Sequence, residues 1–322
     1  MALQCPKCSR ANGDGKTKCM YCGEALPHET VGHVNPQTIP KRLKKAGPKN
    51  YLVTLLPPEK GGMYPESSIS SMAIGRIKEK FSTDEYQIQQ WLKSRGPKIL
   101  KSLPEKEKAE DLAKELRQWN LRALNVCTEE LNTIGHPFRS DSAQIDHETW
   151  IFHGAENQQL PIDPKDALLV VRGRIKVEKN PLKSKKDERK LFGDDGGSEF
   201  HQQDTQDYML LNIFFKSEII PTLSIKSSNF DFTCLGAKTT GSSLINLNLV
   251  ADAFKAIVPT LHIDESFKFI SPILSDLKTA GLFDPTMRHF SGNSDYQNNE
   301  PQFDQHSRLV CYLFKEGISL PQ

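Results

Sequence analysis

The sequence predicts a multi-domain protein of mixed α and β structure, with three modules in chain order. A small four-cysteine module is followed by an α/β sandwich of order βααβαβ, and then by an α+β domain with a mostly antiparallel sheet and two helices. Three observations predict this: clustered cysteines, alternating helical and strand periodicities in the middle, and strand patterns that precede helical ones near the end. The length of 322 residues fits two or three domains.

The expected boundaries follow changes in composition and periodicity. The four-cysteine module spans residues 1–27, the sandwich 49–132 and the α+β domain 165–322. Residues 28–48 read as a basic, proline-containing linker, and residues 133–164, which lack periodicity and contain three prolines, read as a connector. Within the last domain, residues 180–206 form a charged, glycine-bearing insert that we expect to be disordered.

Four of the seven cysteines lie within the first 22 residues, as Cys5, Cys8, Cys19 and Cys22. In each C-x2-C pair one tight turn aims both sulfurs at one point, and two such turns supply the four thiolates that a tetrahedral Zn2+ prefers. The segment resembles the short zinc ribbons at the N-termini of many bacterial proteins, which implies one structural zinc. Since so short a segment buries little surface, the metal would organise it. Rubredoxin-type iron and a pair of redox-active dithiols are the alternatives.

The same cysteines bear on the cellular compartment. Their odd total and the absence of an export signal argue against a disulfide framework. The sequence also contains no run of about 18 apolar residues, the length that a transmembrane helix needs. We therefore expect a cytoplasmic protein with no membrane partner.

Charge is distributed unevenly along the chain. Residues 1–50 hold nine lysines and arginines against three acidic residues, whereas residues 133–322 hold 20 against 25. Basic side chains beside the cysteines offset the charge of about −2 that four thiolates and one Zn2+ carry together. Lys41, Arg42, Lys44 and Lys45 form a further basic run in the linker. A solvated linker is the simpler interpretation of this run, and a nucleic-acid contact is the alternative.

The middle module shows strand patterns near 51–56, 99–100 and 121–126, with helical patterns near 69–81, 86–92 and 105–119. Ser82 and Glu85 have the spacing of a capping box for the second helix. Residues 91–126 resemble the C-terminal domain of the bacterial ribosomal stalk protein, with matching features at Pro97 and Leu116. The resemblance implies a positive φ at Asn120, where that family has glycine. A lysine-bearing helix contacts translation factors in the family, but the matching segment at 86–90 holds no lysine. The resemblance therefore implies the fold and not the partner.

The C-terminal module predicts strands at 167–177, 208–215, 219–225, 230–235 and 309–314, and helices at 243–258 and 265–280. It contains no nucleophile elbow, phosphate loop or H-E-x-x-H motif. The polar candidates for a catalytic or metal site are Asp231, His262, Asp264, Glu265, His289 and His306. Asp264 has the simpler role of a helix N-cap. Cys234 and Cys311 lie in apolar runs and read as buried small hydrophobes.

These observations favour a non-enzymatic interaction or regulatory protein with a zinc-ribbon head and a protein partner. Association with nucleic acid or the ribosome, through the head and the basic run in the linker, is the second hypothesis. An enzyme of unfamiliar type is the third, and it requires a pocket that collects several of Asp231, His262, Asp264 and His289.

Overall fold

A computed structural model describes residues 3–4, 7–8, 10–12, 21–22, 49–59, 64, 69–145, 149–179, 207–269 and 296–320. Contacts divide the chain into two compact units, Met1–Arg42 and Leu43–Gln322, so the predicted middle and C-terminal modules share one unit. The predicted linker at 28–48 and the insert at 180–206 lie outside the described residues. In the described part of the chain, no helix has the length and apolar character needed to cross a bilayer.

The first unit contains a small antiparallel ladder. Strand β1 (Leu3–Gln4) pairs with β2 (Ala11–Asn12), and Gln4 lies opposite Ala11. The chain therefore reverses direction between Gln4 and Ala11. Residues 7–8 and 21–22 both lie in turns.

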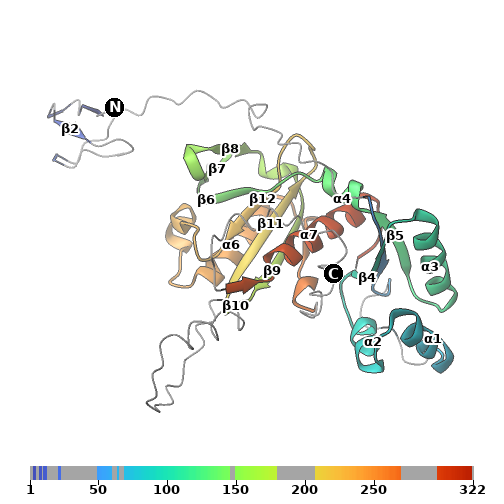
Figure 1. Cartoon of the computed structure of the whole chain (residues 1–322). Coiled ribbons are helices and arrows are strands. Elements are labelled where there is room, and N and C mark those ends of the chain that lie inside the picture. The colour runs from blue at the N-terminus through green and yellow to red at the C-terminus, as the bar shows by residue number, and fades with distance from the viewer. Residues whose placement is uncertain are drawn as a thin grey trace, which may run out of the picture. The chain divides into compact units, whose positions relative to one another are not determined.

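The first part of the second unit has the predicted βααβαβ order (Figure 1). Its elements are β3 (Tyr51–Leu55), α1 (Ser71–Phe81), α2 (Glu85–Leu92), β4 (Lys98–Leu103), α3 (Lys106–Gln118) and β5 (Ala123–Cys127). The strands form an antiparallel sheet of order β4-β3-β5. The three helices share a core with one face of this sheet, and a short helix, α4 (Thr128–Thr133), follows β5.

Two turns in this part test local predictions. Asn120 has a φ of 61°, which confirms the positive value that the resemblance implied. The predicted capping box at Ser82 was wrong: Ser82 ends α1 in the left-handed region, at a φ of 48°. The carboxylate of Asp84 instead accepts a hydrogen bond from the backbone N–H of Gln87 at 2.7 Å and so starts α2. An aspartate N-cap competes directly with a serine two residues earlier, because both residue types accept this bond well.

The rest of the second unit is built on a seven-stranded mixed sheet of order β13-β9-β11-β12-β6-β7-β8 (Figure 1). The strands are β6 (Phe138–Ile145), β7 (Trp150–Gly154), β8 (Gln159–Ile162), β9 (Ala167–Ile175), β11 (Tyr208–Phe215), β12 (Leu223–Lys226) and β13 (His262–Asp264). Strand β13 runs parallel to β9 and β12 runs parallel to β6, while the other pairings in this sheet are antiparallel. A separate pair joins β10 (Val177–Lys179) to β14 (Tyr296–Asn298).

Helices cover both faces of the large sheet. On one face, α6 (Ser243–Ile257), the helix predicted at 243–258, packs through Leu247, Val250, Ala251 and Phe254. On the other face lies α7 (Glu300–Lys315), which packs against β9 and β11 through Phe303, Val310 and Cys311. The opposite side of α7 packs through Leu309 and Leu313 against the small sheet and α4. One helix is thus shared by both sheets.

The connector predicted at 133–164 was wrong, because these residues supply β6, β7 and β8. In β6 the alternation of apolar and polar residues is interrupted by Ser140, a polar residue at a buried position. Its hydroxyl donates to the backbone carbonyl groups of Ser142 and His153, both at 2.8 Å. Pro161 lies on β8, which is an edge strand. Proline is tolerated there because the backbone N–H that it lacks is not needed for a hydrogen bond within the sheet.

Three further assignments also differ from the sequence patterns. Residues 309–314, predicted as a strand, belong to α7. The apolar run at 230–235 enters a 3-10 helix, η5 (Phe232–Lys238), because the Asp231 carboxylate accepts from the backbone N–H of Thr233 at 3.0 Å. The helix predicted at 265–280 begins as a 3-10 turn, η6 (Ser266–Phe269), and its remainder lies outside the described residues.

Candidate functional site

The four-cysteine head is described at Cys8 and Cys22, whereas Cys5 and Cys19 lie outside the described residues. Each described cysteine lies in a turn, which is the local geometry that a C-x2-C pair needs. The guanidinium of Arg10 lies 5.0 Å from the ring centroid of Tyr21. Since Arg10 follows Cys8 by two residues and Tyr21 precedes Cys22, this contact places the neighbourhoods of Cys8 and Cys22 beside each other.

Cys8 and Cys22 are two of the four predicted metal ligands, and among the described residues no group of three or more possible ligands is gathered. The contact between Arg10 and Tyr21 joins the segment that follows Cys8 to the turn that holds Cys22. A cation beside the thiolates also offsets the net negative charge that such a centre carries. If zinc is bound, four thiolates complete its tetrahedral coordination, so its contribution is to hold the fold and not to activate water.

A second candidate is a buried polar cluster that sequence reasoning only partly anticipated. It joins Asp264 at the end of β13, Ser266 in η6 and His306 in α7, which are 4 %, 7 % and 4 % exposed. The Ser266 hydroxyl donates to Asp264 Oδ1 at 2.9 Å, and the Ser266 backbone N–H donates to the same oxygen at 3.1 Å. His306 Nε2 lies 3.1 Å from Ser266 Oγ and 3.4 Å from Asp264 Oδ1.

The protonation of the cluster follows from these contacts. Burial favours the neutral acid, but hydrogen bonds from His306 and Ser266 outweigh it, so the pKa of Asp264 lies below its usual range. A catalytic triad places serine and aspartate on different nitrogens of its histidine. Here both meet the same nitrogen, so the cluster has the geometry of a structural network.

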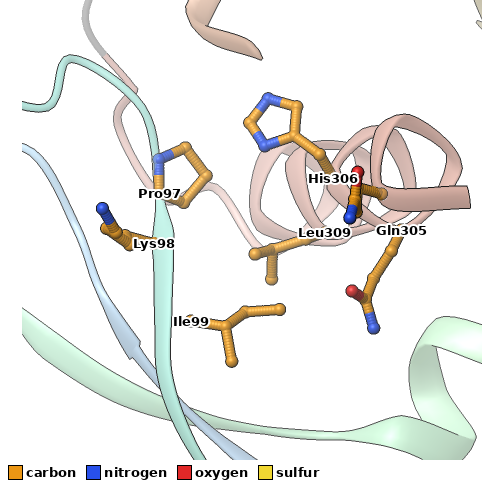
Figure 2. Close-up of a pocket in the computed structure, with 7 residues that line it drawn as sticks. Pro97, Lys98, Ile99, Gln305, His306 and Leu309 are labelled. Carbon is orange, nitrogen blue, oxygen red and sulfur yellow. The ribbon is translucent and has the colours of Figure 1, made fainter. Parts of the chain in front are cut away.

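Close packing over the cluster supports this interpretation. A Cβ atom on Gly96 would lie 2.4 Å from Ser266 Oγ, so the turn before β4 sits directly on the serine. A hollow of about 20 Å3 beside His306, between β4 and α7, is large enough for one water molecule (Figure 2). It is lined by Pro97, Lys98, Ile99, Gln302, Gln305, His306 and Leu309.

Of the remaining sequence candidates, those that the structure describes do not gather around this hollow. The Asp231 carboxylate starts η5, and Glu265 pairs with Arg172, which also donates to the Asn248 side chain at 2.7 Å. The ring of His262 stacks on Phe314 at 5.6 Å between centroids, and burial lowers its pKa despite the nearby Asp264 charge.

One histidine candidate and two cysteines predicted as buried hydrophobic residues remain. His289 lies outside the described residues. Cys311 is buried in the core as predicted, and burial raises its pKa to about 12. Cys234 is partly buried, and burial, together with the Asp231 charge, raises its pKa to about 11. Neither thiol is ionised near neutral pH, which is the opposite of what a nucleophile requires.

Sequence reasoning missed Ser266 and Gly96. No sequence signal pairs two residues from different modules, and a serine after a predicted N-cap is unremarkable by itself. Comparisons with models of protein families, with curated proteins and with solved structures find no match to this chain.

Proposed function

We propose that this chain is a zinc-ribbon interaction protein, in which Cys5, Cys8, Cys19 and Cys22 hold one structural zinc and the head contacts a partner protein. The contact between Arg10 and Tyr21 carries the proposal, because it supports the closeness of the two cysteine pairs. The role is non-enzymatic, since a closed thiolate centre offers no position for a reactant. Four reduced thiolates also favour a reducing compartment, so we place the protein in the cytoplasm.

The head also offers side chains of the type found at protein interfaces. Tyr21 is 53 % exposed, and Arg10, whose guanidinium lies by its ring, is exposed too. Tyrosine and arginine are enriched among the residues that dominate binding energy. A metal centre that holds these two side chains together presents them as one rigid contact surface.

Metal analysis of the purified full-length protein tests the proposal. We expect one zinc per chain in the wild type and none in Cys8→Ser, because three thiolates bind the ion much more weakly. Cys234→Ser is the matched control and should keep its zinc, since Cys234 lies in η5. Tyr21→Ala should also keep its zinc while losing partner capture. Absence of zinc from the wild type, or its loss from Cys234→Ser, contradicts the proposal.

Nucleic-acid or ribosome binding is the second candidate, favoured by the excess of basic over acidic residues in positions 1–50. Such binding would use the head and the run Lys41, Arg42, Lys44 and Lys45. Its affinity should fall linearly in the logarithm of salt concentration, and alanine at these four positions should reduce the slope by about 3 to 4. An affinity that salt leaves unchanged supports the protein-partner proposal instead.

A further inference from the structure

Lys98 occupies an unusual position on the edge of the small sheet. It pairs in register with Leu55 of β3, so its side chain lies on the sheet face that the helices cover. Its ammonium lies 5.8 Å from the ring centroid of Trp91 in α2. Phe81 meets Trp91 edge-on at 5.7 Å and holds that ring in place. Figure 2 shows Lys98 and Ile99 leaving β4 in opposite directions, with Ile99 toward Leu309.

The ammonium of Lys98 therefore lies against an apolar wall. Two other lysines of this unit have a counter-ion: Lys49 pairs with Glu129 at 2.8 Å, and Lys80 pairs with Glu115. No described carboxylate forms an ion pair with Lys98, and the nearest charged residues along the chain are the cations Arg95 and Lys101. A cation that loses water without gaining a carboxylate favours its neutral form, and only the indole face opposes this. In agreement, burial lowers the pKa of Lys98 to about 8.

We propose that Lys98 is a preferred site of Nε-acylation by small acyl phosphates. The neutral amine attacks the acyl carbon, so that a C–N bond forms and the C–O bond to phosphate breaks. Inorganic phosphate leaves, and the proton released from the amine passes to phosphate or buffer. The step needs no oxidant or reductant. It goes beyond the proposed interaction function and does not depend on the metal site.

The expected selectivity follows from the fraction of amine that carries a lone pair. At pH 7.5 about a quarter of Lys98 would be neutral, against roughly one in a thousand of an ordinary lysine. A less basic amine is also a weaker nucleophile, with a Brønsted slope of about 0.4–0.5 by analogy with thiols. The two effects together leave Lys98 roughly ten- to twentyfold faster.

The full-length protein incubated with acetyl phosphate provides the test, with site occupancy followed by peptide mass spectrometry. Lys101 is the internal control, because it is exposed and lies on the same strand. At pH 7.5 we expect initial acetylation about tenfold faster at Lys98 than at Lys101. The rate at Lys98 should level off above about pH 8, well below the pH at which an ordinary lysine side chain loses its proton.

Acetylation of the unfolded protein distinguishes the effect of the folded environment on the rate at Lys98 from the effect of the neighbouring sequence. In concentrated urea the two rates should become equal, because the contact with Trp91 and the burial of Lys98 against the helices are lost. The proposal is overturned if Lys98 reacts no faster than Lys101 in the folded protein. It is equally overturned if the advantage survives in urea, or if the rate at Lys98 shows no plateau.

Discussion

Gly173 in β9 provides the sharpest test of how α7 docks on the large sheet. A Cβ atom at this position would lie 2.5 Å from Cδ1 of Phe267 and 2.6 Å from Cδ2 of Phe303. Carbon atoms in van der Waals contact are about 3.5–4.0 Å apart, so each ring would have to move by about 1 Å. Neither ring has room to move, because Phe303 is 0 % and Phe267 5 % exposed and the two rings pack edge-on at 5.1 Å.

Gly173→Ala should therefore destabilise the protein. Overpacking of this kind costs about 1–3 kcal/mol, and the lower chain entropy of alanine returns about 0.5 kcal/mol. We expect a net loss of about 1.5 kcal/mol and a fall in Tm of roughly 4 °C for a unit of this size. Urea unfolding followed by tryptophan fluorescence measures the change in free energy of unfolding, since Trp150 lies in the core of the same sheet.

Two further variants make the test specific. Gly75 is exposed in the middle of α1, and a Cβ there meets nothing within 4 Å, so Gly75→Ala should stabilise by about 1 kcal/mol. Phe303→Leu should relieve the clash, so the double variant with Gly173→Ala should lose less than the sum of the two single variants. If the free energy of unfolding of Gly173→Ala lies within about 0.5 kcal/mol of the wild-type value, this packing of α7 on the large sheet is refuted.

Three other predictions concern the core, the buried cluster and a helix cap. Leu309→Ala should cost about 3 kcal/mol in urea unfolding, because Leu309 is 1 % exposed between α7 and the small sheet. Because the pKa of Asp264 is lowered in the fold, its carboxylate stabilises the fold fully above about pH 4, and this stabilisation is lost as pH falls through the lowered pKa. The loss in free energy of unfolding that Asp264→Asn causes at pH 7 should therefore shrink toward pH 3. Ser242→Ala should cost about 1 kcal/mol, because the Ser242 hydroxyl caps α6, whereas Glu105→Ala should change little, because Glu105 makes no side-chain cap bond.

The βααβαβ part was predictable because its signals are local. Helical periodicity, Pro97 after α2 and the turn at Asn120 each act within a few residues, and the structure has its elements in the predicted order. The strands at β9 and β11 were predictable for the same reason. In β9, Gly173 and Ile175 are buried while Arg174 is exposed, so the alternation is visible in the sequence itself.

Residues 309–314 show why the rest was not predictable. A surface helix has one apolar stripe and one polar face, but α7 buries Leu309 and Leu313 on one side and Val310 and Cys311 on the other. The resulting run is apolar at every position, and periodicity cannot distinguish such a run from a buried strand. Pro301 in the first turn was the available signal, since proline is favoured at the start of a helix.

The same burial of α7 on both sides bears on how the two sheets depend on each other. Without α7, the small sheet would expose Leu52 and Val126, and the large sheet would expose Leu169 and Val171, all of which are 0 % exposed in the fold. Burying each such side chain contributes about 1.5–3 kcal/mol, so neither sheet keeps a complete core without this helix. The two sheets therefore depend on α7 for folding as well as for contact. The head, by contrast, is a short segment whose stability in our proposal comes from a metal ion, so one chain would combine a shared hydrophobic core with a metal-stabilised recognition element.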